Sequence, residues 1–254
     1  MLEIENVTKS FGGLTAVHDV TFQLGDTGVT GLVGPNGSGK TTLFHLITGF
    51  YKLDRGHIHF NDKRISGLAP HVISRMGLVR TFQQTRVLPF LSVLENLMAA
   101  SPEQTGERLS SVFFQPRRVK LEESENRERA MQILELLKLK PFERHLAGRL
   151  SFGQQKLIEL GKVLMAKPKM ILLDEPTAGV NPTLIRQLVD VIRKLDRRGI
   201  QVFLIEHNMP LVAEICEKVF VMDAGSLIFA GTPSETRQNP RVIEAYLGSE
   251  DHVA

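Results

Sequence analysis

The chain has 254 residues, 42% of them hydrophobic and 23% charged, which is enough for one large globular domain or a domain with a subdomain. A single cysteine, Cys216, excludes an internal disulfide and suits a reducing, cytoplasmic compartment, and the first residues lack the apolar stretch of a secretory signal. No segment approaches the roughly 20 apolar residues that cross a bilayer, and the net charge of +3 lacks the clustered Lys/Arg footprint of a nucleic-acid binder.

The first sixty residues are predicted to be rich in β-strands. Residues 2–7, 17–24 and 57–60 alternate or run apolar with β-branched side chains, and Gly12-Gly13 and residues 54–56 separate them. We expect these segments to pair as hairpin strands.

Three later apolar runs, at 29–33, 170–173 and 202–205, are short and unbroken, as expected for strands buried on both faces of a parallel sheet. Each run leads into polar residues. Because ligands of open parallel sheets collect beyond the carboxyl ends of the strands, we expect the site at that edge.

Helical periodicity dominates from about residue 84 to 165. Ala130, Ile133, Leu134 and Leu137 have the spacing of one buried helix face, while the charged stretch 117–129 mixes both signs and favours a solvated face. This region is predicted to be a helical subdomain.

Local signals mark further boundaries. Ser92 and Glu95 have capping-box spacing, Asn181-Pro182 opens a helix that ends before Gly199, and a closing hairpin at 219–230 turns at 223–225.

A phosphate-binding loop is predicted between the strand at 29–33 and a helix at 41–48. The pattern G-x-x-x-x-G-K-[ST] is matched in full by Gly34, Pro35, Asn36, Gly37, Ser38, Gly39, Lys40 and Thr41. The loop's N–H groups and the helix N-terminus would face phosphate oxygens, Lys40 would add a charge near the β and γ phosphates, and Thr41 would ligate Mg²⁺. We expect Thr42, the next residue, to join this ATP site. The alternative is an ordinary glycine-rich turn.

The run from Met170 to Leu173 ends in two acids. In the presence of a phosphate loop, Asp174 is expected to hold Mg²⁺ and Glu175 to polarise the attacking water as a general base. Alone, this dipeptide would more often be a solvated acidic turn.

The segment Leu150-Ser151-Phe152-Gly153-Gln154-Gln155 is similar to the L-S-G-G-Q signature of the ABC ATPase family, and it lies in that family's usual order before Met170. Ser151 and Gln154 also have capping-box spacing, so the segment predicts a helix start in either case. The resemblance implies an α/β P-loop NTPase fold over residues 1–254. Its core would comprise 1–83 and 166–254, with an antiparallel β subdomain, and its helical subdomain would comprise 84–165.

The same resemblance implies further roles. Ser151, Gly153 and Gln154 would bind the γ phosphate held by a partner subunit's P-loop. Gln83 resembles the glutamine that senses Mg²⁺ and water, His207 resembles the histidine that contacts the γ phosphate, and Phe11 resembles the aromatic that stacks on adenine. Taken alone, His207 would more often be a surface or core histidine, and core packing is an even alternative for Phe11.

Residues 178–182, Phe152, residues 205–209, residues 244–248 and the insertion near 101–128 resemble the longer ATPase of the branched-chain and hydrophobic amino-acid uptake subfamily. Lys156, Gly161 and Lys162 depart from residues common in relatives. The resemblance implies a dimer with a copy or a related ATPase, separate membrane permeases, and indirectly a periplasmic or lipid-anchored binding protein. The chain would then lie on the inner face of the cell membrane.

Two other classes of function compete with this interpretation. A single-domain iron–sulfur assembly ATPase shares the ABC motifs. A P-loop small-molecule kinase would give residues 150–155 and His207 no role.

Overall fold

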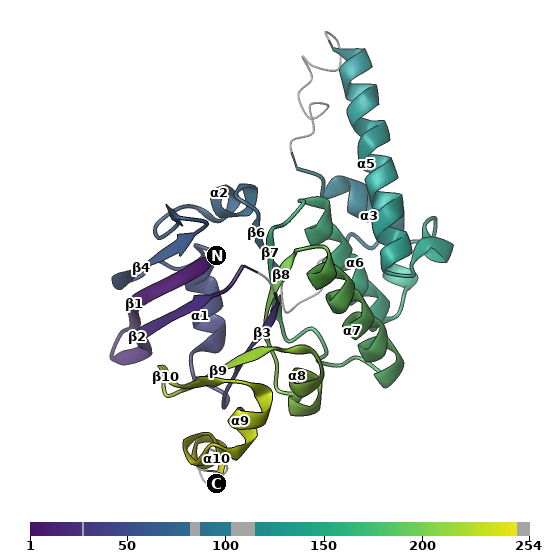
Figure 1. Cartoon of the computed structure of the whole chain (residues 1–254). Helices are drawn as coiled ribbons and strands as arrows, with labels where there is room; N and C mark the ends of the chain where they lie inside the picture. The colour runs from purple at the N-terminus through teal and green to yellow at the C-terminus, as the bar shows by residue number, and fades with distance from the viewer. Residues whose placement is uncertain (27, 82–86, 103–114, 248–254) are drawn as a thin grey trace. The chain divides into compact units, whose positions relative to one another are not determined.

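The computed structural model describes residues 1–26, 28–81, 87–102 and 115–247, and the chain forms two compact units (Figure 1). The first unit comprises Met1–Arg80, Lys169–Thr177 and Ile192–Ala254, and the second comprises Thr81–Pro168 and Ala178–Val191. The sequence placed 178–191 with the core. Contacts within the second unit explain the difference, because the Gln187 amide donates to the Leu137 carbonyl.

A six-stranded sheet forms the centre of the first unit, in the order β10-β9-β3-β8-β7-β6. Its strands are parallel except β10, which pairs antiparallel with β9. The strands are β3 (Val29–Val33), β6 (Leu78–Arg80), β7 (Met170–Asp174), β8 (Gln201–Ile205), β9 (Lys218–Asp223) and β10 (Ser226–Gly231). Every residue of β3, β7 and β8 is buried, as the three apolar runs predicted.

A second, antiparallel sheet of the first unit has the order β2-β1-β4-β5. It consists of β1 (Leu2–Phe11), β2 (Leu14–Leu24), β4 (Arg55–Phe60) and β5 (Lys63–Arg64). The predicted hairpin at Gly12-Gly13 is confirmed, but β4 begins at Arg55 rather than at residue 57. The extension follows from an irregularity in β1 between Glu5 and Thr8, beyond which Thr8 pairs with Arg55.

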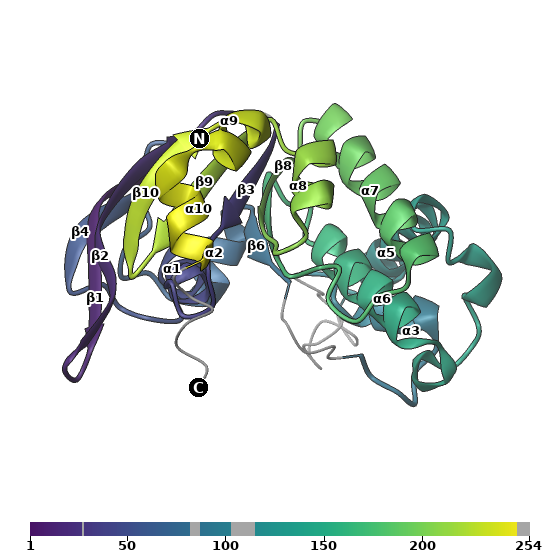
Figure 2. The ribbon, with the colours of Figure 1, turned by 90° about the horizontal axis from the view of Figure 1, so that it is seen from below.

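Helices and both sheets share one hydrophobic core in the first unit. Phe44 of α1 contacts Phe203 of β8, and Phe22 of β2 contacts both Phe203 and Phe220. Helices α9 and α10 pack against β10 (Figure 2). The described helices of this unit are α1 (Lys40–Ile47), α2 (Pro70–Arg75), α8 (Met209–Ile215), α9 (Pro233–Gln238) and α10 (Pro240–Leu247), together with the end of α7 (Pro182–Arg197) from Ile192 onward.

The second unit is helical, as predicted. Its main elements are α3 (Val93–Ala99), α5 (Pro116–Leu136), η2 (Lys140–Phe142), η3 (Ala147–Arg149), α6 (Phe152–Met165) and the first part of α7 (Pro182–Arg197). Helices α3, α5 and α6 contact one another, and the predicted face with Ala130, Ile133 and Leu134 is buried there. The α/β fold with an antiparallel β subdomain and helical segments, implied by the resemblance, is confirmed.

Candidate active site

Adjacent parallel strands bring the candidate residues of the first unit to one edge of the sheet. Gly34 follows β3, Glu175 follows β7 and Glu206 follows β8, and the ladder places β8 between the other two strands. This is the edge of the sheet at which the sequence predicts the site.

The loop between β3 and α1 requires glycine at two positions. Gly34 has φ +145° and Gly39 has φ +96°, a region that L side chains rarely adopt. A Cβ at Gly34 would lie 2.0 Å from the Met222 carbonyl oxygen, and one at Gly39 would lie 2.2 Å from the Ala16 carbonyl oxygen. Neighbouring backbone therefore fixes the path of the loop.

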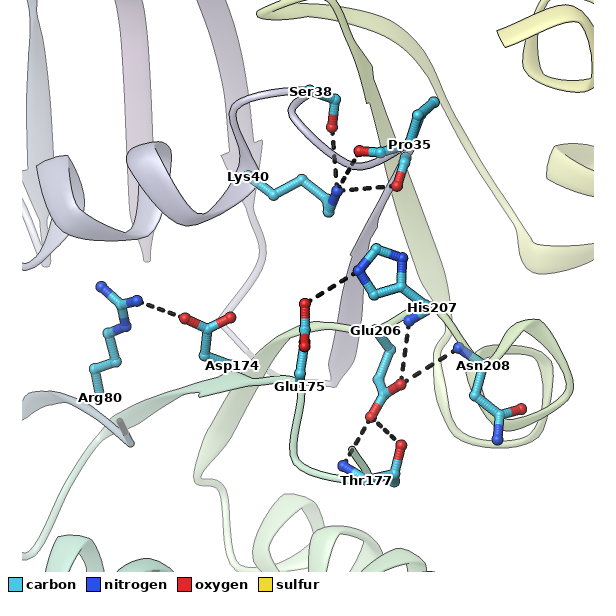
Figure 3. Close-up of polar contacts among 11 residues, drawn as sticks. Pro35, Ser38, Lys40, Arg80, Asp174, Glu175, Thr177, Glu206, His207 and Asn208 are labelled. Carbon is cyan, nitrogen blue, oxygen red and sulfur yellow. Dashed lines mark hydrogen bonds and ion pairs between the residues drawn. The ribbon is translucent and has the colours of Figure 1, made fainter. Parts of the chain in front are cut away.

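Lys40 is the first residue of α1 and is only 5% exposed. Its Nζ donates to the carbonyl oxygens of Gly34 at 2.9 Å and Pro35 at 2.7 Å, and to Ser38 Oγ at 3.2 Å (Figure 3). Burial lowers the pKa of Lys40, although the charges of Glu175 and Asp174 oppose that shift. The ammonium group thus lies inside the loop. Thr41 and Thr42 follow it on the first turn and are half-buried.

Asp174, at the end of β7, forms a buried ion pair with Arg80 at the end of β6. Arg80 Nη2 lies 2.5 Å from Asp174 Oδ2, and both side chains are at most 4% exposed. Burial raises the pKa of Asp174, and the Arg80 guanidinium offsets part of this shift. Arg80 also lies over the Phe44 ring, 5.7 Å from its centroid.

Glu175 and His207 face each other. His207 Nε2 lies 3.1 Å from Glu175 Oε1, and Glu175 has φ 47°, uncommon for a residue other than glycine. Its backbone N–H donates to the Ile205 carbonyl, which ties the end of β7 to the end of β8. The structure therefore brings together the two side chains predicted to act at the γ phosphate.

Two residues of this network have no role in the sequence-based assignment: Arg80 and Glu206. Glu206 is 3% exposed and accepts hydrogen bonds from Thr177 and from the two residues that follow it. A charged residue that interrupts or closes a buried apolar strand is the sequence signal by which both could have been found.

Phe11 lies at the end of β1 and is exposed. Its ring meets the Tyr51 ring edge-on at 5.2 Å, and Lys9 Nζ lies 5.3 Å from its centroid. An exposed aromatic pair of this kind offers a flat surface, so stacking on adenine stays a prediction.

The signature segment belongs to the second unit. Ser151 Oγ accepts from the Gln154 N–H at 3.3 Å, and Gln154 Oε1 accepts from the Ser151 N–H at 3.0 Å, which confirms the predicted capping box at the start of α6. At Gly153, a Cβ would lie 2.4 Å from Leu184 Cδ2 of α7. Gln83, the remaining predicted residue, lies outside the described residues.

Within the described residues, no helix combines the length and the apolar character needed to cross a membrane.

Comparisons with known proteins match nearly the whole chain. Residues 17–178 match the ABC transporter family, and residues 226–252 match the family described as branched-chain amino acid ATP-binding cassette transporter. The chain is 40% identical to the probable branched-chain amino acid transport ATP-binding protein LivG of Archaeoglobus fulgidus, covering 99% of this chain and 96% of that protein. It is 39% identical to the high-affinity branched-chain amino acid transport ATP-binding protein BraF of Pseudomonas aeruginosa, covering 98% of each.

A solved structure gives a consistent result. The crystal structure of a nucleotide-free ATP-binding cassette from an ABC transporter has a TM-score of 0.84 and 38% sequence identity to the chain. The alignment covers 97% of this chain and 98% of that one.

Proposed function

The chain belongs to the ABC transporter family of ATP-binding proteins, and we propose that it hydrolyses Mg-ATP to drive uptake of branched-chain or related amino acids through separate membrane permeases. The observation that carries the substrate class is the match to LivG and BraF over almost the full length of both chains. Both relatives are described as amino acid transport ATP-binding proteins, which favours a role in amino-acid uptake over a role in iron–sulfur assembly.

In the proposed site, the loop from Gly34 to Thr41 and the N-terminus of α1 bind the phosphates of ATP. Lys40 already lies within the loop, so it adds positive charge without a large rearrangement. Phe11 is proposed to stack on the adenine.

Glu175 is the proposed base for the attacking water. His207, 3.1 Å from Glu175, is proposed to contact the γ phosphate. Since Glu175 carries a strained φ and is held through its N–H to Ile205, its carboxylate is oriented before substrate binds.

The donor set of the first unit fits Mg²⁺, a cation that prefers oxygen ligands. A hydroxyl at Thr41 and a carboxylate at Asp174 supply such oxygens. Gln83, the further ligand that the resemblance implies, lies outside the described residues. Mg²⁺ would neutralise charge on the β and γ phosphates when bound. Arg80 keeps the buried Asp174 carboxylate paired and oriented.

The second unit is proposed to complete the site of another chain. Ser151, Gly153 and Gln154 lie at an exposed or half-buried helix start, where backbone N–H groups and the helix dipole favour an anion. We propose that they meet the γ phosphate on the partner's P-loop, in a dimer with a copy or a related ATPase. The dimer would act on the cytoplasmic face of the membrane together with the permeases. A binding protein outside the membrane would deliver the substrate to those permeases.

Uptake in cells that lack this chain tests the substrate class. Labelled leucine, isoleucine and valine should enter more slowly in the deletion strain, and wild-type protein should restore uptake. Glu175→Gln should not restore it. Glu235→Gln, which alters only the exposed capping box of α9, is the matched control and should restore it. Normal uptake of all three amino acids in the deletion strain, with slower entry of an amide or urea, would contradict the substrate class.

A further inference from the structure

Glu206 is a buried carboxylate held between two loops. Its Oε1 accepts from the Thr177 N–H at 3.0 Å and from the Thr177 hydroxyl at 2.5 Å. Its Oε2 accepts from the backbone N–H groups of His207 at 3.1 Å and Asn208 at 3.3 Å (Figure 3). Each oxygen therefore serves one loop.

These two loops carry the proposed base and its histidine. Thr177 lies two residues after Glu175, and His207 directly follows Glu206. The strands that precede the loops are neighbours, with Asp174 opposite Ile205 in the parallel ladder. A single carboxylate thus bridges the segment after β7 to the segment after β8, at the level where Glu175 contacts His207.

Burial of a carboxylate is costly unless hydrogen bonds replace its lost water. In its four hydrogen bonds with described residues, the Glu206 oxygens accept and the partners donate. A core position in need of stability alone would be filled at lower cost by an apolar side chain. Directional hydrogen bonds between one carboxyl group and both loops restrict their relative position more closely than an apolar contact would.

We propose that Glu206 is a positioning residue that sets the contact between His207 and Glu175 and so acts on hydrolysis through His207. The proposal rests on the proposed function, in which Glu175 and His207 act at the γ phosphate. Glu206 itself has no proposed contact with ATP or with the attacking water.

Glu206→Gln tests the bridge because it keeps the shape and changes the hydrogen bonding. An amide has only one acceptor oxygen, so its NH₂ group must face the donors of Thr177 or those of His207 and Asn208. We expect kcat for ATP hydrolysis to fall on the order of tenfold, with the Kd for ATP changed less than about twofold. Glu235→Gln, whose carboxylate also accepts from a backbone N–H and a threonine hydroxyl, is the matched control and should keep wild-type turnover.

Repeating the substitution in a His207→Ala protein distinguishes a positioning role of Glu206 from a general effect on stability. In a His207→Ala protein, adding Glu206→Gln should lower kcat by less than about twofold, because its effect passes through the missing histidine. A full further loss in that background, or wild-type turnover of Glu206→Gln alone, would overturn the proposal while leaving the role of His207 intact. Wild-type turnover of His207→Ala would overturn both.

Thr177→Val provides a milder variant that removes only the hydroxyl donor. If Glu206→Gln does not fold, Thr177→Val should still lower kcat severalfold at unchanged Kd. Wild-type turnover of Thr177→Val, together with an unfolded Glu206→Gln protein, would assign Glu206 to stability alone and overturn the proposal.

Discussion

In the first unit, the two charged residues Lys40 and Asp174 of the candidate phosphate site are buried, and neighbouring groups hold both of them. In the second unit, the side chains of Ser151 and Gln154 bond to each other's backbone within the part of the chain that the structure describes, and Ser151 is exposed to solvent. The candidate residues of the first unit are therefore held by neighbouring groups, whereas Ser151 of the second unit is accessible to solvent. This difference supports the proposal that the first unit binds ATP and that the second meets a nucleotide bound to another chain.

The largest expected effects separate binding from chemistry within the first unit. Glu175→Gln should keep the Kd for ATP within about twofold and lower kcat on the order of a hundredfold or more, because a general base acts in the transition state. Lys40→Ala should weaken ATP binding itself, since the ammonium contacts phosphate in the ground state. Calorimetric binding and steady-state hydrolysis measure the two quantities. Equal loss of binding in both variants would contradict this division.

The next effect concerns stability. Arg80→Met leaves the Asp174 carboxylate buried without its cation, so the free energy of unfolding should fall by about 3–5 kcal/mol in urea titrations. The matched control is Arg118→Met on α5 of the second unit. Arg118 is exposed and pairs with the half-buried Glu122, so loss of this pair should change stability by about 0.5 kcal/mol or less.

Neutralising the partner tests the cause of that loss. Asp174→Asn in the Arg80→Met background should recover part of the stability, since no charge is then left buried. Equal losses in Arg80→Met and Arg118→Met would show that burial does not distinguish the two pairs.

A smaller effect compares two capping boxes of the second unit. Ser151 and Ser92 make the same reciprocal bonds, so Ser151→Ala and Ser92→Ala should each lower the melting temperature by about 2–4 °C. Only Ser151→Ala should also weaken ATP-dependent dimerisation of a Glu175→Gln protein in sedimentation experiments. If Ser92→Ala weakened dimerisation equally, the surface at Ser151 would have no special role.

The last expected effect is a pH dependence in the first unit, at a half-buried histidine. Burial, with the charge of Arg80, lowers the pKa of His45 from 6.5 to about 4. Between these values the unfolded chain binds a proton that the folded chain does not, so stability falls as the pH falls. His45→Gln should flatten the unfolding free energy in this range. The exposed His18→Gln variant is the control, and an unchanged slope in His45→Gln would contradict the assignment.

Local patterns predicted much of the molecule. The loop from Gly34 to Thr41, the two acids at the end of β7 and the capping box at Ser151 are each local in sequence, and the structure places them on the expected elements. Helix α1 nevertheless starts at Lys40 rather than Thr41, a one-residue difference typical of helix ends.

Local sequence patterns did not predict which strands lie next to each other in the sheet. The Arg80–Asp174 pair joins residues 94 positions apart and depends on β6 lying beside β7 in the sheet. The Glu206–Thr177 bridge likewise depends on β8 lying beside β7. The sequence contained these residues but no local signal of strand order, so their roles became visible only in the fold.

We propose that the phosphate loop of one chain, with Lys40, is completed by the helix start at Ser151 of another chain. Lys40→Ala and Ser151→Arg homodimers should each fail to trap ATP, because every shared site then carries one defect. A mixed dimer contains one site that joins an intact Lys40 to an intact Ser151. With mixed dimers isolated by two different affinity tags, ATP trapped per dimer should rise well above that of either homodimer. Trapping in isolated mixed dimers no greater than in the separate variants would contradict the claim.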